Sequence, residues 1–438
     1  MKMTNVRGST SSPRTLVFFF ISLLFFIRPV GAAELENRPG RLTLADSYRM
    51  ALKQSEEIAL RGEFIRESEG RFLQALSGVL PKVSFSSTDK YQDGNGGNAF
   101  TRRHLPERKF TLSQPLFSGF KEFAALHGSK SEKQLRELEK RRAEQLLFVD
   151  VSDAYHRVVE LREDVQVLDS IRETLRRRRE ELQGREKIGR SRGSELVAVQ
   201  AQLYRVESDW ELAQSREAIA VQLLGFLTGQ DAIGELETPE PALPPAEPEQ
   251  AYLSQAAERA DVKAAEQSLE LFKQQLKVAR AGYFPTVDAE GNYYVDRAGI
   301  AEQIKWDASL NVDVPIFEGG RVLGENKEAQ SQLRQAELRL QQARRVALHD
   351  VQDAYTLYEG TLARVRALTK ALEATEESYQ LEEQEYRLNL VSNLEVLSTL
   401  QTLQDARRDL INLLYEGHRA YWRLRTAAGE PVPFEVSR

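Results

Sequence analysis

The sequence predicts a mainly α-helical, internally duplicated chain that also contributes strands to a transmembrane β-barrel. Two observations predict this class. The chain repeats itself at a constant offset, and within each copy the hydrophobic periodicity changes from helical to alternating and back to helical. We therefore expect each chain to contain two long coiled-coil hairpins and two β-hairpins.

Composition limits the classes of protein that fit. The chain has 438 residues, a formal net charge of −6 and 29% charged residues, which argues against a bundle of membrane-spanning helices. The 41% of hydrophobic residues can build a core. The absence of cysteine excludes disulfides, thiolate metal sites and cysteine nucleophiles. The slightly acidic balance gives no reason to expect nucleic acid as a partner.

The first 33 residues have the pattern of a secretory signal peptide. Lys2, Arg7 and Arg14 are basic, residues 16–27 form an apolar run, and residues 31–33 are small. We expect this segment to be removed on export. An uncleaved signal anchor is the alternative.

The duplication divides the remaining chain into repeats. Pro115 and Pro315 lie 200 positions apart, and Asp153-Ala154-Tyr155 recurs at the same offset. The predicted organisation is repeat 1 (34–237), a proline-rich linker (238–248), repeat 2 (249–429) and a C-terminal tail (430–438). Each repeat is expected to begin with a helix, over residues 44–80 and 249–284, that ends before a proline.

One β-hairpin is predicted in each repeat, at about 82–117 and about 286–315. The residues of 305–314 alternate between an apolar and a polar set, so one face of the strand is apolar. Strands of about ten residues suit a tilted bilayer crossing. The side chains expected to face lipid are Phe110, Tyr293, Trp306, Leu310 and Val312.

Long helical hairpins are predicted in the rest of each repeat. Leucines recur every seven residues at 161, 168, 175 and 182, as in a coiled coil. No proline interrupts residues 120–188, so this helix could be about 100 Å long at about 1.5 Å per residue. Such a helix must pack on its return arm and on other copies.

The hairpins of strands need partners, because unpaired backbone groups are not tolerated in lipid. Four strands are too few to close a barrel. We therefore expect a symmetric oligomer in which several chains share one barrel, continued by the helices as a tube. A small soluble sheet on a helical bundle is the alternative.

With these features, the sequence resembles the TolC-type family of outer-membrane efflux and secretion factors. The resemblance spans nearly the whole mature chain and includes Pro81, Pro285 and the segment 315–320 after the last strand. It implies a homotrimer with a twelve-stranded barrel in the outer membrane of a Gram-negative bacterium and a helical tunnel through the periplasm. It also implies a passive duct that docks on an inner-membrane pump through a periplasmic adaptor protein.

The resemblance places adaptor docking at the two turns that join the long helices to their return arms. The first tip is Ile188-Gly189-Arg190, and the second is Leu388-Asn389-Leu390. Asparagine is the commonest non-glycine residue with positive φ, so we expect the second turn to keep the geometry of the first. Plain solvent-exposed turns are the alternative.

A periplasmic gate is likewise implied by the resemblance. Tyr386 matches the tyrosine of its hydrogen-bond network, and Glu395, with its repeat mate Glu195, matches a gate carboxylate. Ser398 and Val391 depart from the family pattern, which predicts a gate held differently. Three copies of Glu395 near an axis would favour cations. A solvated glutamate is the alternative.

Other charged and catalytic features have simpler interpretations. The arginine run 176–179 surrounds the helix with glutamates between, so we interpret it as a solvated, salt-bridged face. The histidines show no metal-ligand spacing, and no nucleotide or nucleophile motif appears. We expect neither an enzyme nor a cofactor. The second function class is a periplasmic coiled-coil scaffold or adaptor without a barrel, and the cargo stays unnamed.

Overall fold

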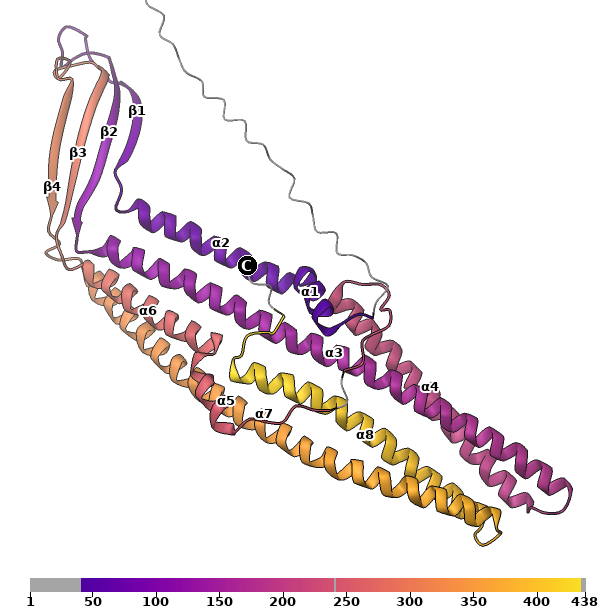
Figure 1. The fold of residues 1–438 in the computed structure, drawn as a ribbon. Coiled ribbons are helices and arrows are strands. Elements are labelled where there is room, and N and C mark those ends of the chain that lie inside the picture. Colours follow the sequence, from indigo (N-terminus) through magenta and orange to yellow (C-terminus); the bar gives the residue numbers. More distant parts are fainter. Residues whose placement is uncertain (1–40, 240–241, 435–438) are drawn as a thin grey trace, which may run out of the picture. The chain divides into compact units, whose positions relative to one another are not determined.

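The computed structural model describes residues 41–239 and 242–434, so the predicted signal peptide lies outside the described residues. The chain is mainly helical with one small antiparallel sheet, as predicted (Figure 1). Among the helices described, none is both long enough and apolar enough to cross a membrane.

The order of elements repeats, with α3 and α7 of 67 residues each and α4 and α8 of 36 residues each. Repeat 1 contains α1 (Leu44–Gln54), α2 (Glu56–Ser77), β1 (Lys82–Tyr91), β2 (His104–Ser118), α3 (Lys121–Lys187) and α4 (Gly193–Thr228). Repeat 2 contains α5 (Glu249–Gln255), a 3₁₀ turn (Ala256–Glu258), α6 (Ala260–Ala281), β3 (Thr286–Arg297), β4 (Trp306–Asp313), α7 (Arg321–Arg387) and α8 (Asn393–Ala428).

The first predicted helix of each repeat is interrupted, so the expectation of one continuous helix was wrong. Ser55 has extended backbone angles (φ −68°, ψ 112°), and its hydroxyl accepts a hydrogen bond from the N–H of Ile58. In repeat 2 the break falls at Arg259 (φ −53°, ψ 143°). Hydrophobic periodicity continues across such a break, because a capping residue lets one helix end and the next begin in similar phase.

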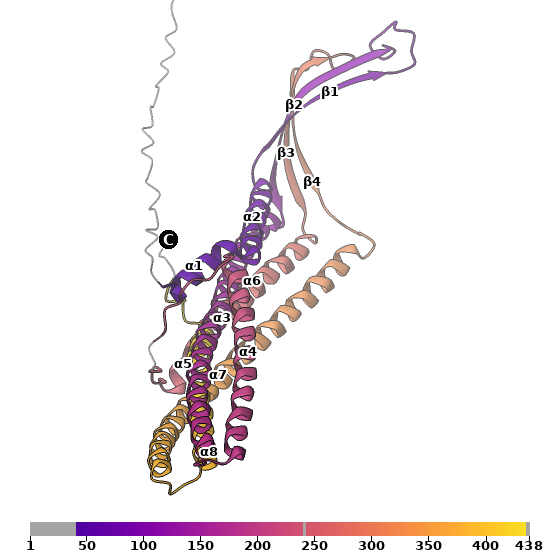
Figure 2. The same cartoon turned by 90° about the vertical axis from the view of Figure 1, so that its right-hand side faces the viewer.

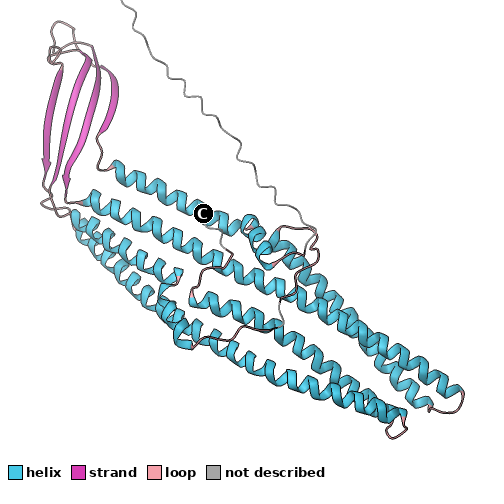
Figure 3. Cartoon of the chain, viewed as in Figure 1, coloured by secondary structure: helices cyan, strands magenta, loops and turns pink. Residues whose placement is uncertain are grey.

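The four strands form one sheet in the order β1-β2-β3-β4, with every pair antiparallel. The central β2–β3 pair joins the two repeats, and the helices extend from one end of the sheet (Figure 3). Residues opposite one another share a face, so the register decides which side chains meet.

The long helices pack as two hairpins that lie side by side (Figures 1 and 2). In the α3–α4 hairpin the predicted heptad leucines are buried. In the α7–α8 hairpin Tyr358 is buried, whereas Val365, Leu372 and Tyr379 are only half-buried. The leucine seam of α3 is therefore covered within the chain and the equivalent seam of α7 is partly open, while the outer face of α4 also exposes apolar side chains such as Val197, Tyr204 and Phe226.

The contact between the hairpins runs along α3 and α8 and is rich in ion pairs. Asp164 accepts two hydrogen bonds from Arg408, at 2.6 and 3.0 Å. Glu160, which is almost fully buried, accepts one from Arg419 at 2.6 Å. Acidic side chains on α3 thus meet arginines on α8, so polar contacts hold the two repeats together.

Candidate functional site

The first helical tip, at the end of α3, is a tight Schellman turn. Gly189 has a left-handed backbone (φ 73°). The N–H of Arg190 donates to the carbonyl of Arg185, and the N–H of Gly189 donates to the carbonyl of Glu186, both at 2.8 Å. These two bonds satisfy carbonyls that the helix end leaves open. Glycine is suited to this position because it has no Cβ to strain it.

The second tip, at the end of α7, has the same turn built on asparagine. Asn389 has φ 60°, so the predicted positive φ is confirmed. The N–H of Leu390 donates to the carbonyl of Glu385 at 2.9 Å, and the N–H of Asn389 donates to that of Tyr386 at 3.0 Å. The duplication therefore preserves the backbone although the residue has changed.

The side chains at the tips differ in character. Ile188 is 67% exposed and Leu388 is 69% exposed, so each tip presents an apolar side chain to solvent. The second tip adds exposed Leu390, whereas the first adds exposed Arg190. Single exposed apolar side chains are common on protein surfaces, but those at these tips are available for contact with a partner.

Tyr386 lies at the contact between the two tips. The guanidinium of Arg178 stacks 4.0 Å from the centre of its ring, and that of Arg185 lies 5.2 Å away. Arg178 Nε also donates to the side-chain oxygen of Asn393 at 2.9 Å. A residue of α3 thus contacts residues of both α7 and α8, and this clamp ties the tips of the two repeats together.

Sequence reasoning missed the role of Arg178. The side chain is only 15% exposed, so the interpretation of the arginine run as a solvated face was wrong for this residue. Its Nη2 and the amide nitrogen of Asn393 are buried without a hydrogen-bond partner. The run of four arginines hid the signal, because on a helix one of four consecutive residues must point inward.

Glu395 and Glu195 form hydrogen bonds at the N-terminal ends of the return helices α8 and α4. Glu395 accepts hydrogen bonds from the backbone N–H and the hydroxyl of Ser392, which forms a capping box for α8. These bonds, the backbone one first, lower the pKa of its carboxyl. Glu195 accepts a bond from the Ser191 hydroxyl at 2.7 Å. Neither glutamate is part of the Tyr386 clamp, and the gate role remains a prediction.

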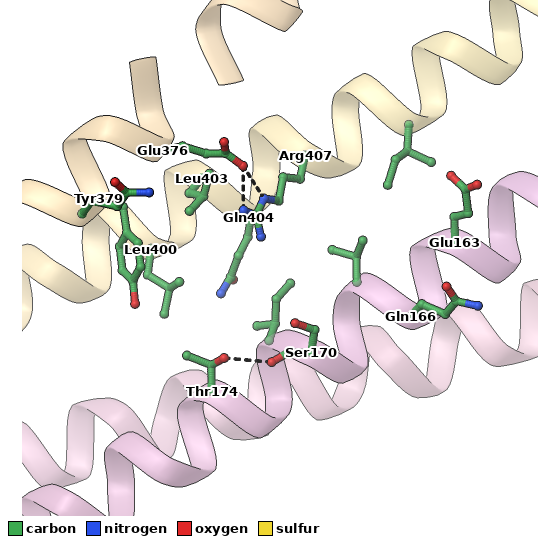
Figure 4. A pocket seen from close by; sticks show the side chains of 14 residues that line it. Glu163, Gln166, Ser170, Thr174, Glu376, Tyr379, Leu400, Leu403, Gln404 and Arg407 are labelled. Atoms are coloured by element: carbon green, nitrogen blue, oxygen red, sulfur yellow. Dashed lines mark hydrogen bonds and ion pairs between the residues drawn. The ribbon is translucent and has the colours of Figure 1, made fainter. Parts of the chain in front are cut away.

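A groove of about 560 Å³ lies between the hairpins, lined by residues of α3, α7 and α8. Figure 4 shows the ion pair between Glu376 and Arg407 beside it, with nitrogen–oxygen distances of 2.6 and 3.1 Å. Ser170 and Thr174 contribute from the opposite side. Sequence reasoning missed this groove, because its lining comes from three helices whose packing no local pattern specifies.

A buried histidine pair crosses the α3–α8 contact. The rings of His156 and His418 stack with centroids 5.4 Å apart and planes 4° apart. Burial lowers the pKa of His156 to about 3, although the Ser152 carbonyl, a hydrogen-bond partner of Nδ1, opposes this shift. His156 is thus held neutral. Nowhere in residues 41–239 or 242–434 do three or more histidine or acidic side chains gather as metal ligands.

The sheet has one largely apolar and one polar face, and ion pairs of Arg108 with Asp89 and Asp296 lie at the loop end of the apolar face. Phe85, Phe110, Tyr293 and Trp306 are opposite one another on successive strands and form an aromatic row across the sheet. Leu310 and Val312 lie on the same face, so the structure gathers all five predicted lipid-facing residues there. All five are exposed in the single chain.

The opposite face carries a network of polar side chains. Asn292 accepts a hydrogen bond from the Thr111 hydroxyl at 2.7 Å and donates to Asp307 at 2.9 Å. The Tyr294 hydroxyl donates to the other oxygen of Asp307 at 2.8 Å. This face suits contact with water, as the alternation of the sequence predicts.

Comparison with known proteins gives consistent matches. Residues 252–430 match the model of the family described as outer membrane efflux protein. The chain is 22% identical to the outer membrane protein TolC of Escherichia coli K12, over 78% of this chain and 73% of that protein. It is 21% identical to the alkaline protease secretion protein AprF of Pseudomonas aeruginosa, over 89% and 84% of the two chains.

The fold matches solved structures as well. The outer membrane protein VceC of Vibrio cholerae superposes with a TM-score of 0.77 at 20% identity, covering 90% of this chain and 97% of that one. The family model covers repeat 2, whereas the structural match also includes repeat 1.

Proposed function

Because this chain belongs to the family of TolC-type outer membrane efflux proteins, we propose that it is the outer-membrane exit duct of an efflux or secretion system and acts as a homotrimer. The observation that carries this proposal is the two-faced, four-stranded sheet above two long helical hairpins. An apolar outer face and a polar inner face are what a shared barrel requires.

The competing scaffold function gives no role to the apolar face. A soluble periplasmic scaffold would expose the aromatic row to water, together with Leu310 and Val312. In a lipid bilayer the same residues lie in a favourable environment, and aromatic side chains are typical of the membrane interface. The duct therefore accounts for the sheet better than the scaffold does.

We propose that the two tips dock on a periplasmic adaptor protein, which connects the duct to an inner-membrane pump. Support comes from the exposed Ile188, Leu388 and Leu390 on turns of fixed geometry. The duct itself is passive and supplies no energy. The name of AprF refers to secretion of a protease, but the cargo of this chain depends on its own pump.

The docking proposal is tested by changing the first turn. Gly189→Leu forces a bulky side chain into a left-handed conformation, so export should be lost while trimers remain in the outer membrane. Gly184→Leu is the matched control, because Gly184 lies in the regular part of α3 with free space around its Cβ position. Normal export by Gly189→Leu would contradict docking at this tip.

The gate proposal concerns Tyr386 and its clamp. We propose that the stacking of Arg178 on Tyr386 keeps the tips of the two repeats together and the periplasmic end narrow. Arg178→Ala should then raise the conductance of the purified protein in planar bilayers. Tyr386→Phe keeps the ring but removes the hydroxyl that accepts a hydrogen bond from Arg185 (3.4 Å), so it measures what that bond adds to the stacking. Equal conductance of wild type and Arg178→Ala would reject the clamp as a gate, and no conductance in any variant would reject the duct.

The ion selectivity of the channel separately tests the proposed role of Glu395 in the gate. If three copies of Glu395 surround a narrow axis, Glu395→Gln should reduce the preference for cations and the block by divalent cations. Glu195, its repeat mate, is the second predicted gate carboxylate, and Glu195→Gln shows whether both repeats contribute to the selectivity. Unchanged selectivity in Glu395→Gln would leave this residue only its role as the cap of α8.

A further inference from the structure

The free edges of the sheet present backbone groups in a defined pattern. The N–H of Gln92 donates to the carbonyl of Arg103 at 3.0 Å, so even-numbered residues of β1 bond to β2. The N–H of Tyr294 donates to the carbonyl of Lys305 at 2.8 Å, so odd-numbered residues of β4 bond to β3. The odd-numbered residues of β1 and the even-numbered residues of β4 therefore point their N–H and C=O groups outward.

Most of these residues carry exposed apolar side chains; Ser87 and Asp89 on β1 are the exceptions. Tyr91 on β1 is 74% exposed and Trp306 on β4 is 69% exposed, and both lie on the apolar face. Val83, Phe85 and Val312 repeat this pattern. In hydrocarbon an unpaired backbone edge is strongly unfavourable, so each edge needs a strand as partner. A second copy supplies it, because one edge is β1 and the other is β4.

We infer that β1 of one copy pairs antiparallel with β4 of the next copy in the register that places Tyr91 opposite Trp306. This inference rests on the proposed function and specifies how the barrel closes. In this register all the outward backbone groups from Tyr91 to Val83 meet those from Trp306 to Val314. The side-chain pairs include Phe85 with Val312 on the apolar face and Lys90 with Asp307 on the polar face.

Charge distinguishes this register from its neighbours. A shift by one residue would place the apolar face of one strand beside the polar face of the other. A shift by two in one direction places Lys90 opposite Lys305 and Asp89 opposite Trp306, and like charges directly opposite are destabilising. The same shift also places Lys82 opposite Asp313, which is favourable, so the repulsion is confined to the Lys90 end of the strand. A shift by two in the other direction places Lys90 opposite Ser309, which leaves its charge without a carboxylate opposite.

The tilt of the strands provides an independent check. Within one copy Lys82, Ser113, Glu290 and Ser309 lie on a line across the four strands. In the proposed register Lys82 of the next copy faces Pro315, six residues beyond Ser309. The next copy is therefore shifted along the strand direction by six residues, or about 20 Å, while the four strands of one copy are together about 19 Å wide. The resulting tilt of about 45° lies within the range of membrane barrels.

The neighbouring registers give different tilts. The register that pairs Lys90 with Lys305 gives about 35°, which is possible for a barrel but carries the charge repulsion. The register that pairs Lys90 with Ser309 gives about 55°, which exceeds the usual range. Charge and geometry together therefore select one register.

Disulfide cross-linking tests this register cleanly, because the natural chain has no cysteine. Thr88 and Ser309 are opposite each other in the proposed register, on the polar face, at a pair that does not exchange backbone hydrogen bonds and so has the closest side chains. The variant Thr88→Cys with Ser309→Cys, oxidised in isolated outer membranes, should form dimers and closed trimers on denaturing gels that reductant reverses.

Two further cysteine pairs would cross-link readily only if the strands paired in a register shifted by two residues, so they test the neighbouring registers. Ser86→Cys and Lys90→Cys, each combined with Ser309→Cys, should cross-link at least roughly tenfold more slowly, because their Cβ atoms lie beyond disulfide distance. Faster cross-linking in either control would overturn the register. No cross-link in any variant of a protein that is trimeric by mass would overturn the edge pairing, whereas a monomer by mass would overturn the proposed function itself.

Discussion

The two helical hairpins have equal lengths and different interiors. In α3–α4 the heptad leucines are buried, with Leu168 only 2% exposed. In α7–α8 the equivalent Leu368, 200 positions later, is half-buried, as are Val365 and Leu372. The leucine seam of the first hairpin is thus covered within one chain and the seam of the second is partly open, although both hairpins expose other apolar side chains, such as Phe226 and Leu357. Duplication has preserved the lengths and the turns, but the two interiors have diverged.

The largest effect expected from this comparison is on stability. Leu168→Ala removes a fully packed side chain and should lower the free energy of unfolding by about 2–5 kcal/mol. Leu368→Ala in the same chain should cost only about 1 kcal/mol, because its side chain is already partly in water. Guanidinium unfolding of the detergent-solubilised protein, followed by circular dichroism, measures both. Equal losses would remove the distinction between the hairpins.

The two repeats should also differ in how low pH affects their stability. His156 is buried in repeat 1, whereas Thr356, its repeat mate, is exposed. Burial lowers the pKa of His156 to about 3, and the nearby His418 and Arg419 also oppose its protonation. The unfolded chain binds this proton below about pH 6.5, so stability should fall by about 1.4 kcal/mol per pH unit between about 6.5 and 3.

Comparing wild type with His156→Gln isolates this contribution. The variant should show a shallower loss of unfolding free energy on acidification, even if it is less stable at pH 7. Thr356→Gln is the control and should leave the pH dependence unchanged. A wild-type slope identical to that of His156→Gln would mean that His156 is not held neutral in the folded protein.

The tips give the third comparison, between glycine and asparagine at positive φ. Gly189→Ala should cost about 1 kcal/mol, because alanine is strained in the left-handed region. Asn389→Ala should cost less, since asparagine already has a Cβ in that conformation. Thermal unfolding of the two variants measures the difference. A larger loss for Asn389→Ala would indicate that its side chain makes contacts beyond the turn.

The smallest expected effect is that of Asn389→Gly. Glycine adopts φ near 60° freely, so the substitution should change the unfolding free energy by less than about 1 kcal/mol and leave export intact. Complementation of export measures the second point. Loss of export with unchanged stability would show that the asparagine side chain itself takes part in docking.

Some of the architecture could be predicted from the sequence because it depends on local periodicity. The proline-free stretch 120–188 predicts α3 almost to its ends, and the alternation in 305–314 predicts the two faces of β4. The break at Ser55 could not be predicted in this way, because a cap depends on backbone angles at one residue. The clamp at Arg178 and the groove beside Glu376 depend on how α3, α7 and α8 pack, which no local pattern specifies.

The proposed barrel, channel and docking roles all require that the chain forms one third of an outer-membrane barrel. The most direct test is the mass of the detergent-extracted protein by light scattering, after separation of inner and outer membranes. We predict a protein mass three times that of the mature chain, recovered from the outer-membrane fraction. A monomer recovered from the soluble periplasm would rule out the shared barrel.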